Sequence, residues 1–214
     1  EENYKSLKER AFQAAVKSGR KESDVRFMAV TKTVESAYIN HAISLGVDLI
    51  GENRVQEFLS KKDELNLENC EKHLIGHLQT NKVKYIADKV YMIHSVDSVK
   101  LAEVISKEAV KAGRVIPILI EVNVAGEESK FGISVLECED FIRNIHQLPG
   151  IHVSGLMTIA PFVENEELNR EHEETMESLH AQKKQLEEQY HEKMSVMEKD
   201  IVDAVIQVFD KVFK

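Results

Sequence analysis

The chain has 214 residues, of which 43% are hydrophobic and 30% charged, enough for one domain with a sizeable core and an appendage. Its formal net charge of −9 argues against a general surface for nucleic acid or for an anionic membrane. The sequence has no apolar run long enough to cross a bilayer, and its two cysteines lack metal-type spacing, so we expect a cytoplasmic protein with reduced thiols and no metal.

The N-terminal part predicts a helix, a strand and a second helix. The amphipathic helix covers Glu1–Ser18, the apolar strand Phe27–Thr31 and the second helix Glu35–Leu45. An apolar run of this length is typical of a strand buried on both faces of a parallel sheet. Lys32 follows this strand, at the end where parallel α/β folds place their functional loops. Within low-polarity walls its amine could condense with an aldehyde, whereas a solvated lysine at a strand end would have no such role.

Five further strands follow at intervals typical of repeated βα units. We predict them at Asp48–Ile50, around Leu74 and Ile75, and at Val90–His94, Val115–Val124 and Ile151–Ile159. Gly51 is predicted to end the second strand, and helices are predicted at Val83–Ala87, Ser98–Lys111 and Val135–Gln147. Polar residues gather after the strands and the sequence has no G-x-G-x-x-G motif, which favours a TIM-like (β/α) barrel over a Rossmann sheet. Only six of the eight strands of a complete barrel are visible.

The composition changes after residue 163. Glu164–Lys193 is polar, without glycine or proline, and predicts a long helix with sparse apolar positions. An apolar stripe then runs from Met194 to Val212 in steps of three and four residues. We therefore divide the chain into a barrel domain, 1–163, and a helical segment, 164–214. The stripe needs a partner, either the apolar edge left open between the first and sixth strands or a second copy of the chain, and we favour self-association as a coiled coil.

Six strings of residues occur in an order typical of one protein family. They are AVTKT, LIGENRVQEF, HLIGHLQTNKVK, HSVDS, EVNVAGEESKFGI and SGLMTIAPF. In order and spacing they resemble the pyridoxal-phosphate-binding homeostasis proteins, which have the alanine-racemase N-terminal fold. The resemblance covers about residues 4–162.

The resemblance implies a (β/α) barrel that carries pyridoxal 5'-phosphate as a Schiff base on the lysine of AVTKT, Lys32. Asn53 of GENRVQE is similar to the family asparagine near the cofactor, and Met157 of SGLMT matches a residue of the pocket wall. The implied role is in pyridoxal phosphate homeostasis, without an established catalytic reaction. Related racemases need a second domain and a second acid/base, which nothing here provides. A reversible Schiff base can store or hand over a reactive aldehyde.

The chain departs from the family pattern after Pro161. The family continues with a seventh strand, an SMGMS-like loop for the phosphate and an eighth strand ending in R-I-G, and neither strand is recognisable here. The nearest echo, MSVMEKD at Met194–Asp200, lacks the glycine that lets backbone amides approach a phosphate. From about Thr175 to Phe213 the chain instead resembles a stalk helix of the flagellar export ATPase regulator.

Two other functions are alternatives to a role in pyridoxal phosphate homeostasis. An interaction protein would work through the C-terminal helix and keep the barrel as a degenerate scaffold. A pyridoxal-phosphate enzyme acting on amino acids would need a second acid/base that the sequence does not reveal.

Four polar residues at the expected mouth have alternative roles. His73 and His77 lack an accompanying carboxylate motif, which favours polar mouth residues over a metal pair. Glu121 and Asn123 end the fifth strand, where they could line a pocket or equally satisfy backbone donors.

Overall fold

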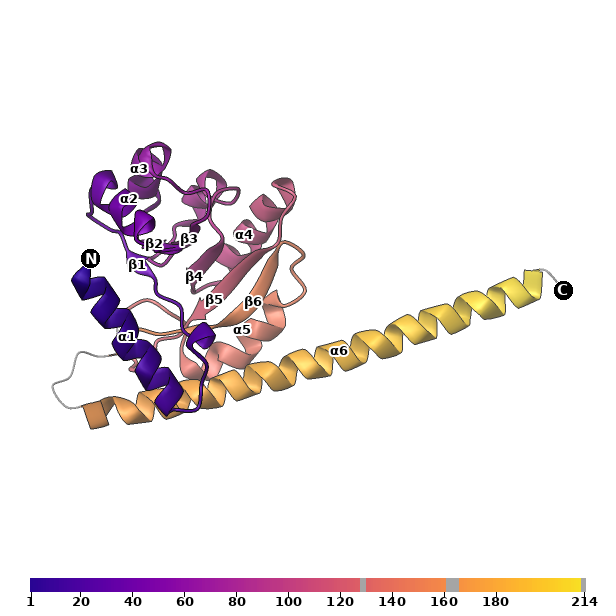
Figure 1. Cartoon of the computed structure of the whole chain (residues 1–214). Coiled ribbons are helices and arrows are strands. Elements are labelled where there is room, and N and C mark those ends of the chain that lie inside the picture. The colour runs from indigo at the N-terminus through magenta and orange to yellow at the C-terminus, as the bar shows by residue number, and fades with distance from the viewer. Residues whose placement is uncertain (128–129, 161–165, 213–214) are drawn as a thin grey trace.

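The computed structural model describes residues 1–127, 130–160 and 166–212 (Figure 1). In the last helix it describes the side chains up to Glu192 and that of Ser195. The apolar stripe from Met194 to Val212 therefore lies outside the described side chains, although the helix itself is described to Val212.

Six parallel strands form one sheet in which each strand pairs with the next along the chain. They are β1 (Ala29–Val30), β2 (Leu49–Glu52), β3 (Glu71–Leu74), β4 (Met92–Val96), β5 (Ile116–Glu121) and β6 (Ile151–Met157). The α-helices are α1 (Glu2–Lys17), α2 (Ser36–Ser44), α3 (Val55–Lys61), α4 (Val99–Lys111), α5 (Cys138–Ile145) and α6 (Arg170–Val212). Short 3-10 helices cover Glu22–Asp24, Lys62–Glu64, Thr80–Tyr85, Val135–Glu137 and Glu166–Asn169. The sequential strand order is that of a (β/α) barrel and confirms the predicted fold class.

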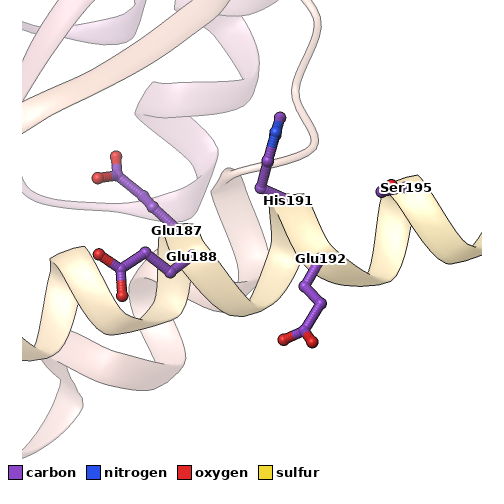
Figure 2. Close-up of a pocket in the computed structure, with 5 residues that line it drawn as sticks. All are labelled: Glu187, Glu188, His191, Glu192 and Ser195. Atoms are coloured by element: carbon purple, nitrogen blue, oxygen red, sulfur yellow. The ribbon is translucent and has the colours of Figure 1, made fainter.

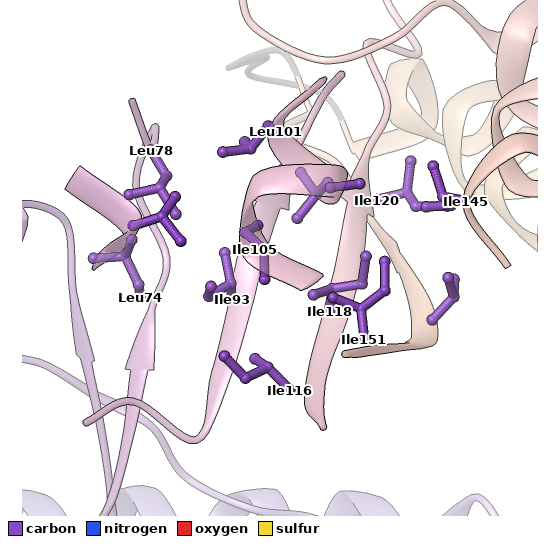
Figure 3. Close-up of a cluster of buried hydrophobic side chains, with 14 of the residues drawn as sticks. Leu74, Leu78, Ile93, Leu101, Ile105, Ile116, Ile118, Ile120, Ile145 and Ile151 are labelled. Carbon is purple, nitrogen blue, oxygen red and sulfur yellow. The ribbon is translucent and has the colours of Figure 1, made fainter. Parts of the chain in front are cut away.

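The main core lies between the sheet and the helices that cover one of its faces. Ile93 of β4 and Ile118 of β5 are register partners, and both are fully buried. Figure 3 shows them beside Ile105 of α4, in one cluster with Leu74 and Ile145. Burying an aliphatic side chain of this size stabilises the fold by about 1.5 to 3 kcal/mol.

The opposite face of the sheet is the inner face of the incomplete barrel. Strand residues alternate between the two faces, so Val30, Gly51 and His73, which are successive register partners, share the inner face. Val30 is 49% exposed. β1 and β6 are the edge strands of the sheet, and neither has a second strand partner among the described residues. The expectation that the first strand is buried on both faces is therefore wrong, because β1 lies at an open edge.

Helix α6 docks on the barrel through its sparse apolar positions. Leu179 and Leu186 are each 4% exposed and join the main core, while Met176 and Tyr190 pack against it from partly exposed positions. In Figure 1 the first part of α6 runs beneath α5 and β6, and the helix then continues beyond the sheet. The prediction of a long helix is confirmed from Arg170 onward, and the four residues before it, Glu166–Asn169, form a 3-10 helix.

Two predictions of local structure are wrong. Gly51 does not end β2, which continues to Glu52. A side chain at Gly51 would collide with Met28 and Ile75, so glycine allows close packing within this strand. The predicted helix Val83–Ala87 is instead a 3-10 helix that begins earlier, at Thr80, and ends at Tyr85.

Candidate functional site

The three predicted site residues lie at C-terminal ends of strands. Lys32 follows β1 and Asn53 follows β2, so both extend from neighbouring strands. Met157 is the last residue of β6, at the opposite edge of the sheet, where it pairs with Glu121 of β5. Met157 is the register partner of Glu121, whereas Lys32 and Asn53 lie in the segments that directly follow their strands.

Lys32 stands in a tight turn after β1 and is exposed. The preceding residue, Thr31, is buried on the α3 side of the sheet, where its hydroxyl donates to Glu52 Oε1 at 2.5 Å. The low-polarity walls expected around Lys32 are therefore not formed by its immediate neighbours. The turn rests on a cluster of charged groups from β2 and α3.

Asn53 is held by close packing of its backbone against the loop after β3. A Cβ atom at Gly76 would lie 2.5 Å from the carbonyl oxygen of Asn53 and 2.8 Å from its Cα atom. The carbonyl oxygen of Gly76 accepts a hydrogen bond from Ser95 Oγ at 2.6 Å. Only glycine permits this approach, which brings the ends of β2, β3 and β4 together.

Met157 pairs with Glu121, whose carboxyl group interacts with that of Asp97. The sequence did not indicate that these two carboxyl groups are neighbours. Glu121 is 6% exposed, and its Oε2 atom has no hydrogen-bond partner among the described residues. Burial, together with the nearby charge of Asp97, raises the pKa of Glu121 to about 6. A carboxyl group with this pKa can hold or release a proton near neutral pH. Register could have found the pair, because Val96 pairs with Ile120.

His77 and Asn123 lie near Glu121 and Asp97, at the C-terminal ends of the strands, which we call the rim of the sheet. His77 Nδ1 lies 3.5 Å from Asp97 Oδ2, and its ring stacks on Phe131 at 3.9 Å between centroids. Asn123 Nδ2 donates to the carbonyl oxygen of Glu127 at 2.8 Å, and Asn123 Oδ1 accepts from the amide of Glu127. Asn123 therefore satisfies backbone groups of its own loop, whereas Glu121 keeps a buried oxygen without a hydrogen-bond partner among the described residues.

His73 belongs to a different group, deeper on the inner face. Its Nδ1 lies 2.8 Å from His94 Nε2, and its Nε2 lies 3.3 Å from Glu71 Oε2. Arg26 donates to the same Glu71 oxygen at 2.9 Å. Burial lowers the pKa of His73, and burial together with His73 lowers the pKa of His94 to about 4. His73 and His77 thus contact different partners. Among the described residues, no three His, Cys, Asp or Glu side chains are placed to hold a metal ion.

A separate hollow of about 620 Å³ lies along α6. Figure 2 shows the residues that line it, Glu187, Glu188, His191, Glu192 and Ser195. All belong to one helix and none to the loops after the strands. Glu187 and His191 also line a neighbouring hollow with His146 and His152, so this side of α6 faces the barrel. No helix in the described part of the chain is long and apolar enough to span a bilayer.

Residues 3–197 match the model of the family described as alanine racemase, N-terminal domain. A pyridoxal phosphate homeostasis protein of Aquifex aeolicus is 43% identical over 166 residues, which make up 78% of this chain and 73% of that protein. A protein of the same name from Pseudomonas aeruginosa is 34% identical over 158 residues, 74% of this chain and 69% of that protein. This chain belongs to the pyridoxal phosphate homeostasis proteins of the alanine racemase N-terminal family.

Solved structures agree with this family. PipY of Synechococcus elongatus, solved with PLP bound, is 30% identical with a TM-score of 0.71, and the match covers 82% of each chain. A protein from Bifidobacterium adolescentis is 37% identical with a TM-score of 0.74, over 81% of this chain and 74% of that one. The alanine racemase of Clostridium difficile 630 shares the fold alone, at 14% identity and a TM-score of 0.59, over 78% of this chain and 46% of that one.

The family match extends further along the chain than the six strings of residues do. It runs past Phe162 and through the docked part of α6 to residue 197. The boundary between 1–163 and 164–214, and the likeness of the tail to a flagellar stalk helix, stay predictions.

Proposed function

We propose that this protein binds pyridoxal 5'-phosphate as a Schiff base on Lys32 and serves pyridoxal phosphate homeostasis. The observation that carries the proposal is the exposed Lys32 in a fixed turn at the C-terminal end of β1, beside the end of β2. The PLP-bound structure of PipY, a 30% identical relative, supports the same ligand for this chain.

The residues of the inner rim fit the aldehyde end of this ligand. The amine of Lys32 can add to the aldehyde carbon, and the nitrogen–carbon double bond forms as one water molecule leaves. Asn53 supplies an amide donor and acceptor near this point, and Met157 an apolar wall on the far side of the rim. Among the described residues we assign none to the phosphate group.

A role in storage or delivery suits this arrangement better than amino-acid catalysis. Bound pyridoxal phosphate supplies an electrophilic aldehyde, and an exposed site allows it to enter and leave. The carboxyl pair of Glu121 and Asp97 lies on the β4–β5 side of the rim, while Lys32 follows β1. We therefore propose a carrier rather than an enzyme, and place it in the cytoplasm as the sequence predicts.

Chemical trapping tests the proposal. The protein is incubated with pyridoxal 5'-phosphate, reduced with sodium borohydride and mapped by peptide mass spectrometry. We expect one dominant adduct, on Lys32, which Lys32→Ala abolishes. Lys107→Ala, at an exposed position on α4, is the matched control and should leave the adduct unchanged. An adduct spread evenly over exposed lysines, and retained in Lys32→Ala, would contradict the proposed site.

A further inference from the structure

A buried lysine of α3, Lys61, lies beneath the turn that carries Lys32. Lys61 is 7% exposed, and Glu52 of β2 is 2% exposed. The ammonium nitrogen of Lys61 lies 2.7 Å from Glu52 Oε1 and 3.1 Å from Glu57 Oε1. A buried ammonium group needs such partners, because its removal from water is costly unless charge and hydrogen bonds compensate.

The same ammonium group also binds the backbone of the turn. It donates to the carbonyl oxygen of Thr31 at 2.8 Å and to that of Val34 at 3.4 Å. Thr31 and Val34 are the first and last residues of the turn, and the amide of Val34 donates to the carbonyl oxygen of Thr31 at 3.1 Å. Lys61 therefore holds both ends of the four-residue turn.

The middle of the turn is held by the carboxylate partner of Lys61. The amide of Thr33 donates to Glu57 Oε1, the oxygen that also contacts Lys61. Thr33 has a φ of 61°, in the left-handed region that β-branched residues seldom adopt. Such a conformation persists where surrounding contacts over-determine it, as the contacts of Glu57 and Lys61 do here.

We propose that Lys61 is a positioning residue for Lys32: with Glu52 and Glu57 it sets the turn geometry that aims the Lys32 amine at the aldehyde of the ligand. The inference rests on the proposed function. Lys61 itself, buried on the α3 side of the sheet, does not contact the ligand. A reacting group must be held near its productive geometry, and residues that lock its backbone control how often it is reached.

The test uses the full chain and separates positioning from folding. Lys61→Met removes the ammonium group and leaves the stem, while Lys61→Met combined with Glu52→Gln also removes the buried carboxylate charge. Lys61→Arg restores a cation, and Lys107→Met is the exposed control. Circular dichroism selects the variants that fold. The two readouts are the rate of adduct formation with pyridoxal 5'-phosphate and the hydrogen exchange of the Thr33 and Val34 amides without ligand.

In folded Lys61→Met, or in the double variant if the single one does not fold, we expect adduct formation at Lys32 to slow at least tenfold. Exchange of the two turn amides should rise by a similar factor while amides of α4 stay protected. Lys61→Arg should recover part of the rate. A folded double variant that forms the adduct at the wild-type rate would overturn the inference and leave the proposed function standing. A wild-type chain that forms no adduct on Lys32 would overturn the proposed function itself.

Discussion

Glu121 is a carboxylate inside the mouth of the sheet, and its environment disfavours its charge. Its pKa of about 6 in the folded chain lies above the ordinary value of 4.5. The unfolded chain therefore loses this proton at lower pH than the folded chain does, and the folded state loses stability as pH rises from about 4.5 to 6. Above that range the full penalty, about 2 kcal/mol, is present.

We predict that Glu121→Gln stabilises the protein at pH 7.5 by up to about 2 kcal/mol and has little effect at pH 4, where Glu121 is itself protonated. Urea unfolding at both pH values measures the difference. Glu103→Gln, an exposed position on α4, is the control and should be neutral. Equal effects at the two pH values would show that the buried charge is not the cause.

His94 makes the opposite contribution to the pH dependence. Its pKa is lowered from 6.5 to about 4 in the folded chain. The unfolded chain therefore takes up this proton at higher pH than the folded chain does, and the folded state loses stability as pH falls through this range. The pH profile of the wild type therefore combines two opposing groups. Comparing each variant with the wild type at one pH isolates Glu121 from His94.

At the scale of the elements, the loops after β2 and β3 pack closely against each other at Gly76. We predict that Gly76→Ala pushes the Asn53 backbone away, because the added Cβ would lie 2.5 Å from the Asn53 carbonyl oxygen. Overpacking of this kind costs about 1 to 3 kcal/mol. Thermal unfolding should show the loss, and the affinity for pyridoxal 5'-phosphate should fall in the folded fraction.

Gly155 of β6 provides the matched control. A Cβ atom there would meet Leu119 Cδ2 at 3.4 Å and His180 Nε2 at 3.5 Å, which are ordinary contacts. Gly155→Ala should therefore be tolerated. If both glycine variants lost the same stability, the contact between Gly76 and Asn53 would have no special role.

At the scale of the whole molecule, α6 joins two parts with different surroundings. Its first part docks on the core through Leu179 and Leu186, and its last part extends beyond the sheet (Figure 1). The stripe from Met194 to Val212 belongs to this last part, and self-association through it stays a prediction from the sequence.

We predict that Ile201→Asp and Val205→Asp each convert a dimer into a monomer in sedimentation experiments, because a charge in an apolar helix seam is costly to bury. The helical signal of the barrel should stay largely intact. A wild-type chain that is monomeric at high concentration, with the same substitutions unfolding the barrel, would show that the stripe packs within its own chain.

The sequence alone determined the order of the elements, the fold class and the position of Lys32. Apolar runs of four to eight residues and helical spacing are local signals, and they do not depend on distant contacts. The sparse apolar positions of the long helix are a local signal of the same kind, and the structure shows that two of them, Leu179 and Leu186, join the main core.

Only the tertiary structure decided which side chains support the site. Lys61, Glu52 and the turn at Thr33 come from separate elements, and their contacts depend on how α3 packs over β1 and β2. The pairing of Glu121 with Asp97, and the strand that continues through Gly51, likewise follow from strand register. Periodicity reports which face of an element is apolar, but it does not report which elements meet or in what register. In this protein those contacts hold the backbone of the turn that carries Lys32 and bury Glu121.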